Sequence, residues 1–219
     1  MYPHEIPIVE QIMNANDQVA AQNRRLLDTH RVHAINIMAS PGAGKTTLIL
    51  STIEALRGKR SVAVIEGDIA SSVDADKVRA AGVPAYQINT GGNCHLDALQ
   101  VRAALRELPL DMTDLLFIEN VGNLICPVGF DLGEHTKLAI ASIPEGDDKP
   151  HKYPGIFSAV DVLVITKTDL LPWVPFNLPE YRRLVRSLNP NLRLFELSCV
   201  TGVGLDEWIT WLMQVAAGK

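Results

Sequence analysis

Ser40-Pro41-Gly42-Ala43-Gly44-Lys45-Thr46 lies between an apolar run at residues 33–39 and a helical pattern at residues 45–56, and this stretch decides the fold. In a strand-to-helix turn of this composition, successive backbone N–H groups and the helix N-terminus converge on phosphate oxygens. Lys45 is expected to reach the β and γ phosphates, and the Thr46 hydroxyl to bind Mg²⁺. The stretch therefore predicts a site for a purine nucleoside triphosphate with Mg²⁺.

Glycine usually opens such a phosphate loop, and Ala39 stands at that position here. Gly42 and Gly44 keep the permissive backbone where a phosphate must approach closely. A chance glycine-rich turn is the alternative, and Gly-Lys-Thr between a strand and a helix argues against it. The nucleotide is expected to contact Gly42, Ala43, Gly44, Lys45, Thr46 and Thr47.

Length and composition indicate one globular domain. The chain has 219 residues, of which 47% are hydrophobic, enough for one sizeable core. Twenty Lys and Arg against twenty-five Asp and Glu give a net charge of −5, so nucleic acid is not an expected partner. No apolar run approaches the roughly 20 residues of a membrane span, and residues 1–5 lack the layout of a secretory signal. We expect a cytoplasmic protein with no membrane contact.

Short apolar runs alternate with helical patterns along the chain. Such runs, hydrophobic nearly throughout, are typical of a parallel sheet covered on both faces, which predicts an α/β fold, a three-layer sandwich with a mostly parallel sheet. An amphipathic helix over residues 6–31 forms an N-terminal segment (1–31) that packs on the phosphate-loop domain (32–219). Residues 127–154 are expected to be a loop-rich insertion with a short helix or strand. The expected strands are 33–39, 61–66, 85–89, 114–119, 161–166 and 192–198, and the expected helices 45–56, 75–81, 95–108, 178–188 and 205–217.

Carboxylates end two of the expected strands. Glu119 is placed to hold Mg²⁺ through a water, and the Gly122 N–H to donate to a γ-phosphate, as in switch loops that sense the nucleotide. Asp68 follows the strand at residues 61–66, at the carboxyl edge where ligands collect. A solvated strand end is the alternative for each carboxylate. The expected catalytic residues are Lys45, Thr46, Asp68, Glu119 and Gly122, with Thr46, Asp68 and Glu119 holding Mg²⁺.

Two segments favour guanine over adenine. Thr166-Lys167-Thr168-Asp169 is similar to the Asn-Lys-x-Asp element of GTPases, in which the carboxylate accepts from two N–H groups of guanine. Lys167 is expected to pack its stem along the base, and Asp169 to read it. Because Thr166 replaces the Asn, the amide that braces the phosphate loop is expected to be absent. Ser198 and Cys199 begin a base loop, Ser198-Cys199-Val200-Thr201-Gly202, similar to the Ser-Ala-x-Thr-Gly loop of GTPases.

Thiol and imidazole groups occur in two further places. Cys94 and His95 join a strand to a helix, and Cys126 follows the Glu119 to Gly122 segment. Zn²⁺ and Ni²⁺ both accept such ligands. Three ligands cannot close a tetrahedral shell in one chain, whereas two copies meeting at a two-fold axis can. From spacing alone, buried thiols and a helix-capping histidine are the favoured interpretation.

Several segments together resemble the HypB family, the SIMIBI-class phosphate-loop GTPases that assist nickel insertion into nickel-iron hydrogenase. The resemblance runs from about Val32 to the C-terminus and includes most of the preceding helix. It rests on the residues 40–47, Glu66-Gly67-Asp68, Cys94-His95-Leu96-Asp97-Ala98, the residues 119–127, and Lys152-Tyr153-Pro154.

The resemblance implies a mechanism and partners. It makes Cys94, His95 and Cys126 ligands of Ni²⁺ or Zn²⁺ where two subunits of a homodimer meet. GTP then favours the dimer, and slow hydrolysis changes the metal site so that nickel passes onward. Lys152 is expected to approach the base of the partner subunit's nucleotide. A small HypA-like nickel and zinc protein and the precursor of the hydrogenase large subunit are the implied partners.

Two other functions compete with this interpretation. A urease nickel chaperone of the UreG type shares the phosphate loop and the Glu-x-x-Gly switch, but its metal motif is Cys-Pro-His. Here Cys126-Pro127 is followed by Val128. The second alternative is a non-catalytic metal-binding scaffold whose fold the nucleotide merely stabilises.

Overall fold

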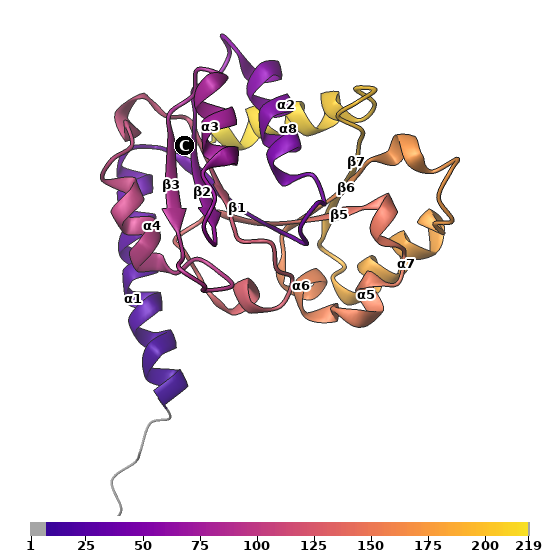
Figure 1. Cartoon of the computed structure of the whole chain (residues 1–219), viewed down its shortest axis with the longest axis horizontal. Coiled ribbons are helices and arrows are strands. Elements are labelled where there is room, and N and C mark those ends of the chain that lie inside the picture. Colours follow the sequence, from indigo (N-terminus) through magenta and orange to yellow (C-terminus); the bar gives the residue numbers. More distant parts are fainter. Residues whose placement is uncertain (1–7, 219) are drawn as a thin grey trace, which may run out of the picture.

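One parallel sheet forms the centre of the computed structural model, which describes residues 8–218 (Figure 1). Within these residues the sheet has seven strands in the order β3-β2-β4-β1-β5-β6-β7, and every neighbouring pair is parallel. The α/β prediction is confirmed. The strands are β1 (His33–Ala39), β2 (Val62–Asp68), β3 (Ala85–Asn89), β4 (Leu115–Glu119), β5 (Thr136–Ser142), β6 (Val162–Thr166) and β7 (Arg193–Glu196).

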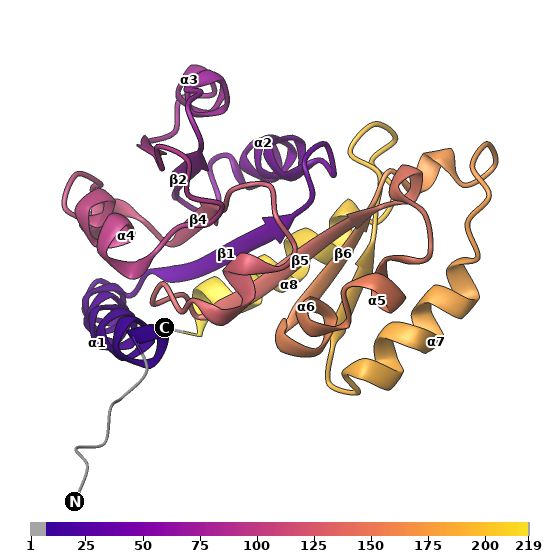
Figure 2. The ribbon, with the colours of Figure 1, turned by 60° about the horizontal axis from the view of Figure 1, so that its bottom comes forward.

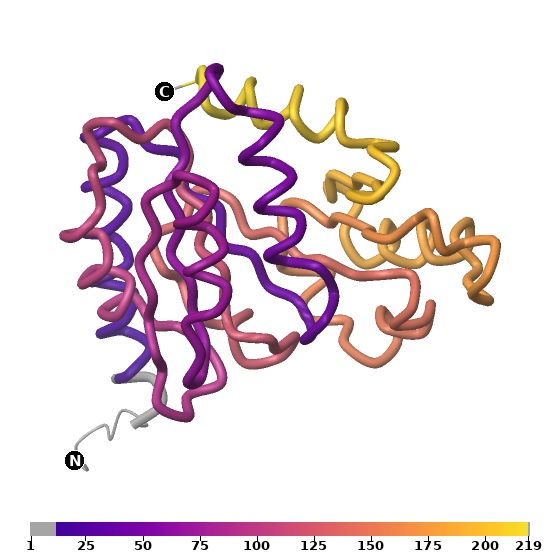
Figure 3. Tube along the Cα trace, turned by 45° about the horizontal axis from the view of Figure 1, so that its top comes forward, coloured from indigo at the N-terminus to yellow at the C-terminus, as the bar shows by residue number. Residues whose placement is uncertain are grey.

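Helices cover both faces of the sheet, which gives the three predicted layers. Figure 2 shows α2 and α3 above the sheet and α1, α6 and α7 below it. α8 runs beside α2, where the Trp208 indole donates to the Thr52 hydroxyl at 2.8 Å (Figure 3). The helices are α1 (Ile8–Thr29), α2 (Lys45–Leu56), α3 (Val73–Ala80), α4 (Ala98–Leu105), α5 (Lys149–Lys152), α6 (Pro154–Ala159), α7 (Leu178–Leu188) and α8 (Leu205–Ala217).

Burial explains why the central strands are apolar throughout. All seven residues of β1 and all five of β4 are buried, because alternate side chains face different helices. Ile35 and Ile37 pack with α2 and α8 on one face, whereas Ala34 packs with α1 and α4 on the other. The carboxyl ends of these strands point to one edge, where ligands of such sheets collect.

Residues 127–154 do carry a strand and short helices, as expected, but residues 136–142 belong to the central sheet and not to an insertion. This stretch is β5, which pairs with β1 and β6 and lies in the middle of the sheet. Its apolar run is short and is followed directly by Ile143-Pro144-Glu145, a 3₁₀ turn with a capping box, so turn residues hid the strand. The remainder of the segment does carry short helices.

α1 packs beside α4 and closes one edge of the lower layer. The predicted start of this helix at Ile6 lies outside the described residues, and the helix ends at Thr29, before Arg31 adopts a positive φ of 58°. Gly133 approaches α1 so closely that a Cβ there would lie 2.7 Å from the Ala20 carbonyl oxygen. Among residues 8–218, no helix has the length and apolarity to cross a membrane.

Candidate nucleotide and metal site

The phosphate loop forms a turn between β1 and α2 at the carboxyl edge of the sheet. Gly42 and Gly44 have positive φ values of 77° and 101°, which glycine adopts without steric cost. Gly44 is the N-cap of α2, so the first helical N–H groups point out of the turn. A cleft of about 460 Å³ opens here, and its lining includes Gly42, Gly44, Lys45, Thr46, Thr47, Asp68, Lys77, Glu119, Gly122 and Lys167.

The switch segment, residues 119–122, contacts the phosphate loop in two places. The Thr46 hydroxyl donates to Glu119 Oε1 at 3.1 Å, and Lys45 Nζ lies 3.9 Å from the same oxygen. A Cβ on Gly122 would lie 2.8 Å from Pro41 Cγ and 3.1 Å from Pro41 N. The structure therefore brings all five expected catalytic residues to one cleft, and a side chain at position 122 would require Pro41 or the switch segment to shift.

Glu66 lies beside Glu119 on the neighbouring strand and was missed as a site residue. It is 3% exposed, and its register partner on β4 is Glu119. Burial, together with the charge of Glu119, raises the pKa of Glu66 to about 10, and burial also raises the pKa of Glu119. One oxygen of each carboxyl is buried without a hydrogen-bond partner. A buried charged residue within an apolar strand was the available signal.

The donor set in the cleft fits Mg²⁺. Hard oxygen ligands from a hydroxyl and carboxylates suit this ion, and within residues 8–218 Glu66 Oε1 and Glu119 Oε2 are buried without a hydrogen-bond partner. Asp68 Oδ1 accepts from the N–H groups of Ala70 and Ser71, at 2.9 and 2.7 Å, which fixes that carboxylate at the rim. A bound Mg²⁺ would neutralise negative charge on the β and γ phosphates.

The brace of the phosphate loop is present, contrary to the expectation drawn from the missing Asn. The Thr166 hydroxyl donates to the Ala43 carbonyl at 2.7 Å, and Lys167 Nζ donates to the Gly42 carbonyl at 2.8 Å. Lys167 holds a left-handed φ of 60°, which is uncommon for a residue with a side chain. A hydroxyl and an ammonium thus take the place of the amide.

Asp169 and the base loop lie next to one another beyond this brace. The Thr168 N–H donates to the Leu197 carbonyl at 3.3 Å, which holds the two segments together. Asp169 Oδ1 is buried and has no hydrogen-bond partner among the described residues. Burial, with a further effect of the Asp169 charge, raises the pKa of the Cys199 thiol. An unpaired buried carboxylate oxygen is costly unless a ligand supplies a donor.

Ser198 fixes the conformation of the base loop through hydrogen bonds to its buried side chain. Its side chain is fully buried, and its hydroxyl accepts from the N–H groups of Val200 and Thr201, each at 3.2 Å. Contacts from this loop to a base would therefore come from its backbone.

Lys152 and Lys149 lie on α5, one turn apart. Lys152 is exposed, pairs with Asp148 and is absent from the cleft lining of its own chain. Lys149 Nζ lies 3.5 Å from both the Ser40 hydroxyl and Glu145 Oε1, at the start of the phosphate loop. Sequence reasoning missed Lys149, because the resemblance pointed only to Lys152.

Two of the expected metal ligands, Cys94 and Cys126, are in contact, and the third, His95, follows Cys94 in the chain. A contact with the Cys126 thiol raises the pKa of Cys94, whose side chain is exposed. His95 stacks on Phe130, with ring centroids 3.9 Å apart, and its Nδ1 lies 3.0 Å from the Leu96 carbonyl oxygen. Donation to this oxygen leaves Nε2 free as a ligand. Within residues 8–218, no three His, Cys, Asp or Glu side chains gather closely enough to hold a metal ion.

Asn123 joins the two segments that carry the thiols. Its amide nitrogen donates to the Cys94 carbonyl at 3.4 Å, and its Oδ1 accepts from the N–H groups of Ile125 and Cys126, at 2.8 and 3.4 Å. The positions of Cys94 and Cys126 are thereby tied to the end of the switch segment.

Comparison with known proteins gives consistent matches. The model of the CobW/HypB/UreG nucleotide-binding domain matches residues 33–196. The hydrogenase maturation factor HypB of Azotobacter vinelandii is 47% identical over 205 residues, 94% of this chain and 68% of that protein. The structure of HypB from Archaeoglobus fulgidus has a TM-score of 0.87 at 39% identity, covering 93% of this chain and 99% of that one. HypB from Helicobacter pylori in complex with nickel has a TM-score of 0.89 at 34% identity, covering 93% and 96%. The chain therefore belongs to the HypB family, within the CobW/HypB/UreG group of nucleotide-binding proteins.

Proposed function

We propose that this protein is a GTP-hydrolysing metallochaperone that assists nickel insertion during the maturation of nickel-iron hydrogenase. The observation that carries the proposal is the placement of Cys126 beside Cys94, directly after a switch segment whose Glu119 contacts Thr46. A change in the conformation of the phosphate loop can therefore alter the position of Cys126 through the short segment from Glu119 to Cys126. The relatives support the same role, since they are named hydrogenase maturation factors and one was solved with nickel.

Guanine is the proposed base, and GTP with Mg²⁺ the proposed substrate. The unpaired oxygen of Asp169 fits the N–H donors on the edge of guanine, which adenine lacks. Lys45 and the Gly122 N–H would bind the β and γ phosphates, with Thr46, Asp68 and Glu119 on the Mg²⁺ side. The acceleration from these groups is expected to be small without a residue that orients water, so intrinsic hydrolysis is slow.

A homodimer would complete the metal site. Within residues 8–218 of one chain, no three His, Cys, Asp or Glu side chains gather closely enough to hold a metal, so Cys94, Cys126 and His95 of a single subunit do not complete a site. Two copies of Cys94 and Cys126 meeting across a two-fold axis would supply the four ligands of a tetrahedral shell for Ni²⁺ or Zn²⁺. Nickel is the cargo, received from a HypA-like protein and delivered to the large-subunit precursor, in the cytoplasm.

Single-turnover hydrolysis separates this function from a scaffold. Purified protein in excess over labelled GTP, with Mg²⁺, should form GDP and phosphate over minutes to hours. Lys45→Ala is the negative control, because it removes the ammonium that reaches the γ-phosphate. GTP left intact by the wild type after many hours would contradict the enzymatic role.

Metal binding is tested with a matched set of cysteine variants. Cys94→Ala and Cys126→Ala should each lose stoichiometric Ni²⁺ binding and keep GDP affinity within about three-fold. Cys199→Ala is the control, since Cys199 lies in the base loop away from the pair. Retention of one Ni²⁺ per subunit in the Cys94→Ala, Cys126→Ala double variant would show that other ligands hold the metal.

A further inference from the structure

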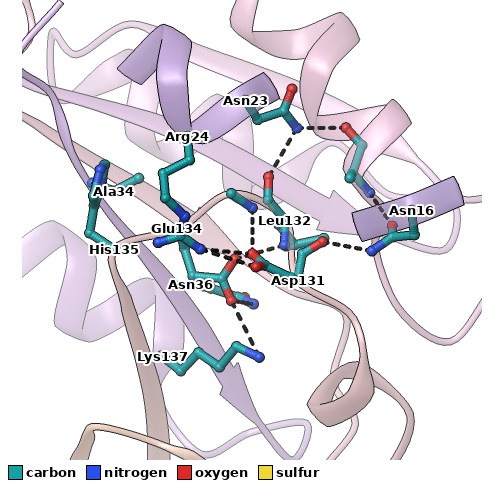
Figure 4. Close-up of polar contacts among 12 residues, drawn as sticks. Asn16, Asn23, Arg24, Ala34, Asn36, Asp131, Leu132, Glu134, His135 and Lys137 are labelled. Carbon is teal, nitrogen blue, oxygen red and sulfur yellow. Dashed lines mark hydrogen bonds and ion pairs between the residues drawn. The ribbon is translucent and has the colours of Figure 1, made fainter. Parts of the chain in front are cut away.

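A buried polar network connects α1 with the centre of the sheet (Figure 4). Asn23 Nδ2 donates to the Leu132 carbonyl at 3.0 Å, and the Leu132 N–H donates to Glu134 Oε2 at 2.7 Å. Glu134 Oε1 accepts from Asn36 Nδ2 at 3.3 Å, inside β1. Glu134 is 2% exposed and Asn36 is fully buried. None of these side chains lines the nucleotide cleft, but Asn36 connects them to a residue of the switch segment.

The next residue along this network is Asn120, in the switch segment. Asn120 is 1% exposed, and its Nδ2 donates to Asn36 Oδ1 at 3.2 Å. Its Oδ1 accepts two N–H groups at 3.0 Å each, one from Val121 and one from Leu96. One amide oxygen thus joins the switch backbone to the backbone of the metal loop, which we define as residues 94–96.

Leu96 is tightly packed against β2. Its side chain is fully buried, and a Cβ on Gly67 would be 2.8 Å from Leu96 Cδ1. Leaving a buried N–H unpaired costs about 1–3 kcal/mol, so loss of either contact with Asn120 Oδ1 is unfavourable. His95, one of the expected metal ligands, directly precedes Leu96 in the chain.

The chain just beyond the metal loop is anchored on α1. The Ala98 N–H donates to Asn16 Oδ1 at 2.9 Å, and Asn23 Nδ2 donates to the Ala98 carbonyl at 2.8 Å. This anchor belongs to a helix outside the nucleotide site, whereas the Leu96 N–H, two residues earlier, is bound by a switch residue.

We propose that Asn120 is a positioning residue that couples the nucleotide state to the metal ligands within one subunit. The inference rests on the proposed function, and it assigns the coupling to one side chain. Rearrangement of Val121 and Gly122 around a γ-phosphate moves Asn120 Oδ1, and the Leu96 N–H follows it. His95 and Cys94 are displaced relative to Cys126, which changes metal affinity.

The test compares Ni²⁺ affinity with Mg²⁺–GDP and with a non-hydrolysable GTP analogue, by competition against a chelator. The wild-type ratio of dissociation constants should be at least about five-fold, a typical coupling between linked sites. Asn120→Ala should reduce this ratio to within two-fold. Asn120→Asp loses the donation to Asn36 Oδ1 but keeps an oxygen acceptor for both N–H groups, so it should retain the ratio if that acceptor carries the coupling. Asn23→Ala, the matched control on α1, should change Ni²⁺ affinity equally in both states. A ratio unchanged in Asn120→Ala would overturn the proposal.

A measurement without metal separates this proposal from the proposed function. Hydrogen exchange of the Leu96 amide in the wild type should differ at least about three-fold between the two nucleotide states. In Asn120→Ala it should be fast in both. Equal protection of Leu96 in both wild-type states would overturn the coupling, even if the variant fails to fold. If Ni²⁺ does not bind while Leu96 exchange still responds, the metal function fails and the coupling is supported.

Discussion

The Thr46 hydroxyl donates a hydrogen bond to Glu119 Oε1 at 3.1 Å, which joins the start of α2 to the last residue of β4. The two residues are 73 positions apart in the chain and meet because β1 and β4 are neighbours in the sheet. Both side chains are acceptable ligands, directly or through water, for the Mg²⁺ that accompanies a nucleoside triphosphate.

Thr46→Ala is therefore expected to weaken the binding of GTP with Mg²⁺ by roughly 10- to 100-fold, because about 1.5–3 kcal/mol accompanies a hydrogen bond to a charged group. Calorimetric titration with and without Mg²⁺ measures this effect. The affinity without Mg²⁺ is the control and should change little. Equal losses in both conditions would show that Thr46 acts on the fold and not on the cation.

Thr166→Val removes the hydroxyl that braces Ala43 and keeps the shape of the side chain. The Ala43 carbonyl then lacks this donor, so the free energy of unfolding should fall by about 1–2 kcal/mol and GDP affinity by several-fold. Thr166→Ser is the matched control, since it retains the hydroxyl. Urea denaturation and GDP titration of both variants give the comparison. Identical behaviour of the two variants would show that the brace does not depend on the hydroxyl.

Asp169→Asn is expected to change the choice of base. In the proposed function the buried carboxylate accepts from guanine, whereas an amide would donate to the additional carbonyl of xanthine. Competition between GTP and xanthosine triphosphate should shift by at least about ten-fold toward the latter. Asp147→Asn serves as a control, because Asp147 accepts from the Asn177 N–H away from the base loop. An unaltered preference in Asp169→Asn would remove Asp169 from base recognition.

Gly122→Ala should impair binding of the triphosphate more than binding of the diphosphate. The new methyl would meet the Pro41 ring at 2.8 Å and its backbone nitrogen at 3.1 Å, so the switch segment must move away from the phosphate loop. Affinity for a GTP analogue should fall at least about ten-fold, because the N–H proposed for the γ-phosphate is displaced. GDP affinity should fall less than three-fold. Equal losses for both nucleotides would indicate a general distortion of the loop.

Glu134→Gln tests the buried network through its pH dependence. Burial, and secondly the charge of Asp131, raises the pKa of Glu134 in the folded state. The folded state then binds the proton more tightly, so this stabilising effect is complete below the unfolded pKa of about 4.3 and is lost as pH rises. The variant should gain stability relative to wild type as the pH rises above the unfolded pKa, by at most about 1.4 kcal/mol per pH unit, until the raised folded-state pKa is passed. Urea denaturation at several pH values measures it, and a constant difference would contradict the raised pKa.

Much of the fold could be predicted from local pattern. The apolar runs at His33–Ala39 and Leu115–Glu119 are buried on both faces, which is why their composition alone indicated strands. A strand was expected within residues 127–154, but its bounds were not placed because Pro144 and Gly146 follow Thr136–Ser142 almost directly and gave the segment the composition of a loop. Its position between β1 and β6 is a property of the sheet and has no local signature.

The candidate site likewise combines residues that local sequence predicts with contacts that only the folded chain creates. Gly42, Gly44 and Lys45 act through the local turn, so their spacing was sufficient to place them. The brace by Thr166 was not predictable, because sequence comparison recorded a missing amide and could not show that a hydroxyl reaches the same loop. Asn120 contacts Asn36, which is 84 positions away, and only the packed sheet brings the two together.

The most direct test of the account is the molecular mass of the protein during titration with Ni²⁺, once with Mg²⁺–GDP and once with Mg²⁺ and a non-hydrolysable GTP analogue. The account predicts a dimer in the GTP-like state, with a Ni²⁺ affinity at least about five-fold different from that in the GDP state. The same mass and the same Ni²⁺ affinity with both nucleotides would contradict it.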